Sequence, residues 1–85
     1  MLCFVYILGS KGPRPSTYVG WTTDLERRLA EHNAGTGARS TRGRAWFLLY
    51  AERHASKAEA MSREWHLKKE RRFRKLVCEV GRLSP

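Results

Sequence analysis

Two side chains of the stretch TYVGWTTDLERRLAEH (17–32) have types and a spacing that suit phosphate chemistry. Arg28 and His32 lie four residues apart, and therefore on one face of a predicted helix. An arginine can clamp a phosphate through two parallel N–H donors. A histidine can donate a proton to a reacting oxygen or accept one from it. Taken alone, this spacing is explained more simply by ordinary charge on a helix surface.

Two tyrosines and a glycine precede this helix on predicted strands. In an extended chain Tyr6 shares a face with Phe4 and Leu8, while Tyr18 shares one with Gly20. Either tyrosine can fill the core with its hydroxyl at the rim, which is the commoner fate of a strand tyrosine. Gly20 is either a plain turn glycine or a position at which substrate backbone comes close.

Glu64 is a carboxylate within a strongly basic tract. It lies on the second predicted helix, at the margin of the apolar stripe and among the cations of residues 63–75. Such a carboxylate usually serves as an ion-pair partner. It can instead carry a divalent ion, because Mg²⁺ needs only one or two protein carboxylates when waters and a substrate phosphate complete its shell.

The composition predicts one small domain, residues 1–85, with a polyanionic partner. Of its 85 residues 41% are hydrophobic, which is enough for one compact core. Its 17 Lys and Arg against 8 Asp and Glu give a net charge of +9. This excess favours nucleic acid over a membrane, since the basic tract lacks a large apolar face. The candidate contacts to a phosphate backbone are Arg27, Arg39, Arg42, Arg44, Lys68, Lys69, Arg71 and Arg72.

The cysteines and the N terminus indicate a cytoplasmic protein. Cys3 and Cys78 lie at opposite ends of the chain and match no metal-binding pair, so we expect both thiols to be reduced. The apolar run of residues 3–9 is too short to span a bilayer and lacks the basic leader of a signal peptide.

The hydrophobic pattern predicts three strands and two helices. Residues 3–9 and 17–21 are β-branched and aromatic runs joined by a short turn, which favours an antiparallel hairpin. Residues 45–53 have the composition of a third strand, and a helix is expected from Ser56 to about 75, with a break near 70–72 left open. The order strand, strand, helix, strand, helix, with a further C-terminal helix as an option, predicts an α+β fold. We expect a small three-stranded antiparallel sheet flanked by helices.

The first helix carries clear end signals. Thr23 and Glu26 match a capping box, so the helix is expected to begin at Thr23. It should end near residue 33, with Gly35 as a left-handed C-terminal cap. Leu25 and Leu29 are expected to face the core.

The remaining large side chains are assigned by periodicity. Ala58, Met61 and Trp65 repeat along one face of the second helix, which predicts that they face the core. Core packing is likewise expected for Trp46. Trp21, just past Gly20, is the tryptophan best placed to stack on a base.

Taken together, these residues resemble the GIY-YIG nuclease family. Phe4-Val5-Tyr6 corresponds to the first motif of that family and Tyr18-Val19-Gly20 to the second. Arg28 stands eight residues after Gly20, as the family's catalytic arginine does, and His32 follows at the next turn. Glu64, within AMSREWHLKK, matches the family's metal-binding glutamate. The resemblance covers nearly the whole chain and is greatest to small stand-alone bacterial members, although Phe4 replaces the glycine of the first motif.

The resemblance implies a metal-dependent DNA endonuclease, acting in DNA repair or on branched or single-stranded DNA. One Mg²⁺ or Mn²⁺ ion on Glu64 would assist hydrolysis of the phosphodiester. Arg28 would stabilise the charge that develops on the phosphorane. Tyr6 would orient or deprotonate the attacking water, with Tyr18 or His32 assisting, and the sequence leaves open which of the three is the general base.

Two other hypotheses fit the same residues. A non-catalytic nucleic-acid-binding module would keep the fold and the basic surface without cutting. A nuclease subunit would depend on a protein partner or a homodimer for specificity, since we expect no separate DNA-selecting domain of the kind that other family nucleases carry.

Overall fold

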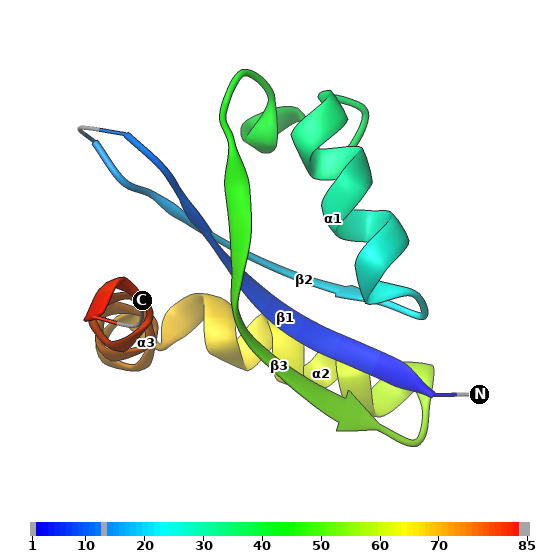
Figure 1. Ribbon diagram of the computed structural model, residues 1–85. Helices are drawn as coiled ribbons and strands as arrows, with labels where there is room; N and C mark the ends of the chain where they lie inside the picture. Colours follow the sequence, from blue (N-terminus) through cyan, green and yellow to red (C-terminus); the bar gives the residue numbers. More distant parts are fainter. Residues whose placement is uncertain (1, 13, 84–85) are drawn as a thin grey trace.

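The computed structural model describes residues 2–12 and 14–83, with the backbone alone for 82 and 83 (Figure 1). The chain forms, in order, β1 (Cys3–Ser10), β2 (Thr17–Thr22), α1 (Leu25–Ala34), the short 3-10 helix η1 (Arg39–Thr41), β3 (Trp46–His54), α2 (Lys57–Lys69) and α3 (Arg71–Leu83). The predicted α+β order is confirmed, and the optional C-terminal helix is present as α3.

The three strands form one antiparallel sheet in the order β2-β1-β3. Because β1 is central, it is paired on both sides, and all but one of its residues are buried. Its apolar, β-branched sequence suits that position. Tyr6 lies opposite Gly20 on β2 and Ala51 on β3. The predicted hairpin and sheet are therefore confirmed, and the register places the tyrosine of the first motif against the glycine of the second.

Alternation along β1 divides the core into two layers. Val5 and Ile7 face α2, where they pack with Leu67 in one buried cluster. Tyr6 and Leu8 point to the opposite face, toward α1. Leu25 and Leu29 of α1 pack on this second cluster, as do Tyr18 and Trp46, so both leucines and Trp46 are core residues as predicted. The two layers hold α1 and α2 on opposite sides of the sheet (Figure 1).

The end signals of α1 predicted one end correctly and the other incorrectly. Asp24, and not Thr23, is the N-cap: its side chain accepts a hydrogen bond from the Arg27 amide at 3.1 Å. The predicted capping box is wrong because Thr22 turns the chain one residue later, bonding the Asp24 amide at 3.1 Å. Gly35 adopts the left-handed conformation, with φ 81°, and closes the helix as predicted.

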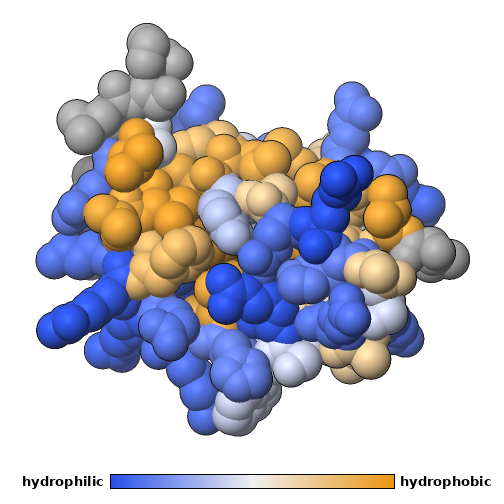
Figure 2. Space-filling view, turned by 90° about the horizontal axis from the view of Figure 1, so that it is seen from below, coloured by the Kyte–Doolittle hydropathy of each residue, from blue (hydrophilic) through white to orange (hydrophobic). Residues whose placement is uncertain are grey.

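The second predicted helix is two helices with a break at Glu70. Ser56 caps α2 as expected, accepting from the Glu59 amide. Its buried face is formed by Ala60 and Leu67. Met61 and Trp65 are instead 48% and 55% exposed, so their prediction as core residues is wrong. Apolar side chains consequently lie on the surface beside hydrophilic ones in the view from below (Figure 2). Within residues 2–12 and 14–83, no helix is long and apolar enough to cross a bilayer.

Candidate active site

Three buried side chains form a hydrogen-bonded chain between the sheet and α1. The Tyr6 hydroxyl lies 2.9 Å from His32 Nε2, and His32 Nδ1 lies 2.8 Å from Thr41 Oγ1. The Thr41 hydroxyl donates its own hydrogen to the Ala38 carbonyl at 2.8 Å. Its oxygen must therefore accept the hydrogen on His32 Nδ1. Nε2 of the neutral ring is then left to accept a hydrogen bond from Tyr6.

Burial keeps Tyr6 and His32 uncharged. Their exposed fractions are 2% and 0%. Burial, and then the positive charge of Arg28, lower the pKa of His32 from 6.5, so the ring is neutral at pH 7. Burial raises the pKa of Tyr6 from 10.0 to about 12, and the opposing effect of Arg28 does not cancel this rise. Tyr6 is accordingly a neutral donor and His32 a neutral acceptor.

Gly20 leaves room for the Tyr6 ring at the edge of the sheet. A Cβ atom at Gly20 would stand 2.5 Å from Tyr6 Oη and 2.7 Å from Cζ, closer than atoms can pack. Tyr18 adds a second ring, with its centroid 4.8 Å from that of His32 and 6.3 Å from that of Tyr6. The two predicted catalytic tyrosines and His32 thus form one cluster.

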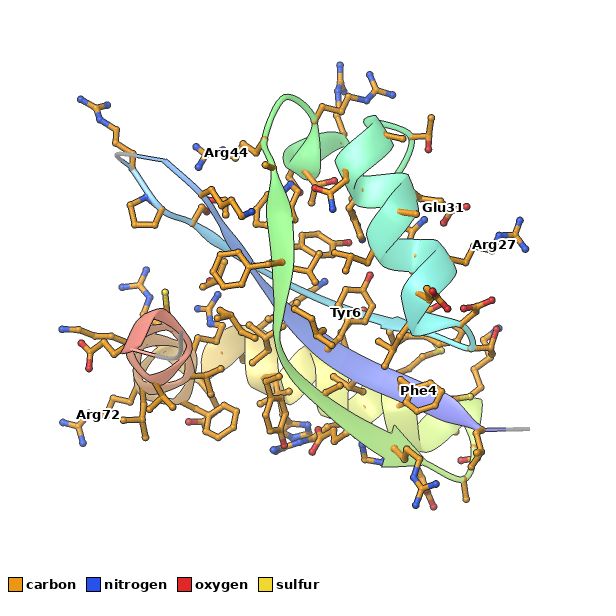
Figure 3. The ribbon with its side chains drawn as sticks, viewed as in Figure 1. Phe4, Tyr6, Arg27, Glu31, Arg44 and Arg72 are labelled. Carbon is orange, nitrogen blue, oxygen red and sulfur yellow. The ribbon has the colours of Figure 1, made fainter. Side chains whose placement is uncertain are left out.

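Arg28 belongs to the same cluster and is fixed by a carboxylate. Its Nη1 donates to Glu31 Oε1 at 3.0 Å within α1. This bond raises the pKa of the guanidinium above its ordinary value, so Arg28 stays charged. After burial, Arg28 is the strongest influence on the pKa of both Tyr6 and His32. In Figure 3, Tyr6 rises from β1 toward α1, and Glu31 lies on that helix.

Glu64 lies on α2, on the opposite side of the sheet from α1, and its charge acts on Tyr6. Its negative charge contributes weakly to the raised pKa of Tyr6, after burial and the effects of Arg28 and Tyr18. Its carboxylate is 22% exposed and pairs with Lys68 Nζ at 3.3 Å. Over the described ranges, no three His, Cys, Asp or Glu residues gather into a metal-binding group. One accessible carboxylate still suits Mg²⁺ or Mn²⁺, which take oxygen ligands and keep several waters.

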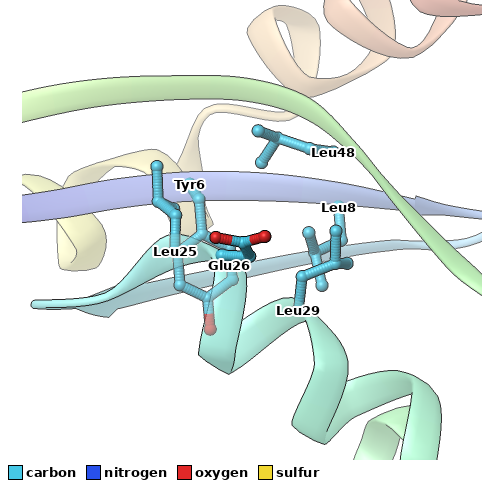
Figure 4. Close-up of a pocket in the computed structure, with 6 residues that line it drawn as sticks. All are labelled: Tyr6, Leu8, Leu25, Glu26, Leu29 and Leu48. Carbon is cyan, nitrogen blue, oxygen red and sulfur yellow. The ribbon is translucent and has the colours of Figure 1, made fainter.

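An apolar cavity lies beside the Tyr6 side chain. It has a volume of 210 Å³ and is lined by Tyr6, Leu8, Leu25, Glu26, Leu29 and Leu48 (Figure 4). Leucines from β1, β3 and α1 form most of its wall. The cavity therefore provides no further polar group next to the Tyr6 hydroxyl other than the exposed Glu26.

The basic residues expected near the first helix lie on its outer face and the following loop. Arg27 is 77% exposed and lies 3.7 Å from a neighbouring carboxylate (Figure 3). Arg39 and Arg42 are exposed. Arg44 is engaged within the protein, because its Nη1 donates to the Arg14 carbonyl at 2.9 Å and so ties the loop to the β1–β2 hairpin.

The basic residues of the second tract differ among themselves. Lys68 pairs with Glu64, and Lys69 lies over the Trp65 ring, 3.9 Å from its centroid. Arg71 and Arg72 are exposed at the start of α3. Trp21 is half-buried, with Lys57 Nζ 5.5 Å from its ring centroid. Its proposed stacking on a base stays a prediction.

Two residues that position the site were not predicted from the sequence. Thr41 is 0% exposed and sets the tautomer of His32, yet it lies in a loop without periodic pattern. Asn33 bonds both backbone groups of Trp46, accepting from the amide at 2.6 Å and donating to the carbonyl at 3.1 Å. It thereby joins the end of α1 to the start of β3. Asn33 stands in the last turn of the helix, two residues before Gly35, so nothing in the sequence marked this role.

Comparison with known proteins identifies a family and several relatives. The GIY-YIG catalytic domain matches residues 2–76. A UPF0213 protein of Clostridium perfringens is 49% identical over 74 residues, which cover 86% of this chain and 77% of the relative. One from Halobacterium salinarum is 52% identical over 59 residues, 68% of this chain and 77% of the relative. The solution NMR structure of a UPF0213 protein from Bacillus halodurans aligns with a TM-score of 0.53 and 39% identity, covering 94% of this chain and 85% of that one.

Proposed function

Because this chain belongs to the GIY-YIG nuclease superfamily, we propose that it is a metal-dependent endonuclease that hydrolyses DNA phosphodiesters. The observation that supports the proposal best is the cluster itself. Tyr6, His32 and Arg28 are brought together in defined protonation states, and Glu64 lies within electrostatic reach of Tyr6. A basic chain of net charge +9 suits a DNA substrate.

Tyr6 is proposed to act as the base through His32. With a pKa near 12, its hydroxyl is protonated at neutral pH and cannot take a proton while keeping its own. Its hydrogen already points at His32 Nε2. As the attacking water gives a proton to Tyr6 Oη, the phenolic hydrogen passes to Nε2, and the water oxygen bonds to phosphorus. The bond from phosphorus to the leaving oxygen breaks, and that oxygen keeps the electron pair and takes a proton from solvent. The neutral His32 becomes an imidazolium that Thr41 continues to hold.

Arg28 is proposed to bind the phosphate and the charge that grows on it. Its guanidinium is permanently charged and its ion pair with Glu31 restricts its position. A preorganised donor of this kind stabilises a developing oxyanion most where solvent is excluded. Arg28 also disfavours a charged His32 before the reaction, which keeps the acceptor available.

Glu64 is the residue that would hold a divalent ion. It is an accessible carboxylate, and the flexible side chain of Lys68, which pairs with it, can turn away. When bound, Mg²⁺ or Mn²⁺ would supply Lewis-acid stabilisation of the scissile phosphate and the leaving oxygen.

A nicking assay on labelled single-stranded, duplex, flap and four-way DNA tests the proposal, with Mg²⁺ or Mn²⁺ against EDTA. Arg28→Ala and Glu64→Gln should lose cutting by about 100-fold or more while retaining DNA binding. Arg27→Ala and Glu59→Gln are the matched controls, since each removes the same charge from the same helix at an exposed position. Binding without cutting on every substrate, for the wild type as well, would point to a binding module or to a subunit that requires a partner.

A further inference from the structure

We propose that a cationic groove between the β1–β2 hairpin and α3 binds the DNA backbone beside the cleavage site. This inference rests on the proposed function, because it names a second contact for the same substrate. The groove has a volume of 380 Å³ and is lined by Pro15, Ser16, Thr17, Arg71, Arg74, Lys75, Cys78 and Glu79. Three cations and two hydroxyls face one carboxylate there, which is the chemistry that recognises a phosphodiester.

The position of α3 turns its three basic side chains in the groove toward the β1–β2 hairpin. Arg71, Arg74 and Lys75 follow the three- and four-residue spacing of one helix face. Phe73, on another face, packs edge-to-face on Tyr50 of β3, with ring centroids 5.1 Å apart. Because the apolar face is held against the sheet, the cationic face is turned toward the start of β2.

Arg74 is the residue that most clearly lacks an internal role. Its side chain is half-buried, and its Nε atom is shielded from solvent without a hydrogen-bond partner among the described residues. A buried donor of this kind is costly unless it is satisfied. A phosphate bound in the groove would let the guanidinium turn toward it and so satisfy this donor. Three other arginines, Arg28, Arg44 and Arg63, donate hydrogen bonds within the protein.

The groove and the catalytic cluster lie along the same edge of the sheet. β2 is an edge strand, Thr17 at its start lines the groove, and Gly20 lies against the Tyr6 hydroxyl. Three residues of extended chain span roughly 10 Å. A span of this size covers a short stretch of nucleic-acid backbone, so the groove would hold a phosphate within about three nucleotides of the scissile one.

Binding measurements in EDTA test the groove independently of cutting. Arg74→Gln and Lys75→Gln are compared with Arg53→Gln, which removes a charge at an exposed position of β3 that does not line the groove. We expect Arg74→Gln to weaken oligonucleotide binding about tenfold and to reduce the salt slope by about 0.7. Lys75→Gln, at an exposed position, should weaken binding less and leave folding unchanged, and Arg53→Gln should change affinity less than about threefold. Equal losses of affinity in all three variants would overturn the groove proposal.

Replacing single phosphates of the DNA by uncharged linkages then locates the phosphate that the groove contacts. Methylphosphonates are placed one at a time on both sides of the observed cut. One linkage within about three nucleotides of the cut should weaken binding by the wild type and have no further effect on Arg74→Gln. If every position weakens both proteins alike, the groove does not hold a defined phosphate. If no protein cuts DNA but Arg74→Gln still binds about tenfold more weakly than Arg53→Gln, the groove stands and the nuclease proposal fails.

Discussion

At the scale of single residues, the site depends on the direction of two hydrogen bonds. Thr41 gives its hydrogen to Ala38 and can only accept from His32 Nδ1. His32 Nε2 is therefore the acceptor for the Tyr6 hydroxyl. A threonine of η1 thus decides which way a proton can move at the proposed catalytic tyrosine. His32 is thus the acceptor, a choice that the sequence left open, and the proposed proton transfer would let a tyrosine with a high pKa serve as a base.

Replacing Thr41 by valine tests the hydrogen-bonded chain from Tyr6 through His32 to Thr41. The substitution keeps the shape but leaves the His32 Nδ1 hydrogen buried without an acceptor, which should lower the free energy of unfolding by about 1–3 kcal/mol. Urea denaturation measures the change. Thr41→Ser is the control, because it keeps the hydroxyl and should lose markedly less. Similar losses in the two variants would show that packing, and not the hydroxyl, accounts for the effect.

The buried imidazole also predicts a dependence of stability on pH. The pKa of His32 is below 6.5 in the folded protein, while the unfolded chain has the ordinary value. The unfolded state therefore binds more protons as the pH falls below 6.5, and the free energy of unfolding decreases there. Urea denaturation at about pH 7.5 and about pH 5.5 measures the decrease. In His32→Asn the free energy of unfolding should decrease less between these two pH values. A decrease as large as that of the wild type would rule out His32 as the cause.

At the scale of elements, the sequence predicted the strands and two of the helix caps well, and the start of α1 and the helix faces less well. The hairpin, β3 and the caps at Gly35 and Ser56 follow from local chemistry that acts within a few residues. The faces of α2 depend on which side of the helix the sheet covers, and Met61 and Trp65 were placed in the core by periodicity alone. The break at Glu70 is likewise a tertiary outcome. It allows α3 to turn and pack Phe73 on β3.

The pairing of β1 with β2 requires a glycine at position 20. Because Gly20 lies opposite Tyr6, the added methyl of Gly20→Ala would overlap the phenol ring and push it away from His32. We expect cutting to fall by about 100-fold and stability by about 1–3 kcal/mol. Single-turnover cutting and urea denaturation of the same preparation measure both. A Gly20→Ala variant that cuts at the wild-type rate would show that the tyrosine position is not critical.

At the scale of the whole molecule, the fold brings together residues that the sequence had singled out. Tyr6, Tyr18, Arg28 and His32 come from three elements and form one cluster through the sheet register and the packing of α1. The ordered motifs made that set predictable. Asn33 and Thr41 were not, because their partners at Trp46 and His32 lie 13 and 9 residues away and no local pattern encodes such contacts. The basic residues differ in role, and the sequence did not separate them. Arg44 donates a hydrogen bond within the protein, while Arg71 lines an open groove.

The measurement that tests the central claim most directly compares single-turnover DNA cutting by the wild type and by Tyr6→Phe, with Mg²⁺ and with binding measured separately in EDTA. Phenylalanine keeps the ring packed beside Gly20 and removes only the hydroxyl that donates to His32. The account predicts DNA binding within about twofold of the wild type and cutting slower by about 100-fold or more. Cutting by Tyr6→Phe at the wild-type rate would contradict it, because no proton could then pass through Tyr6 to His32.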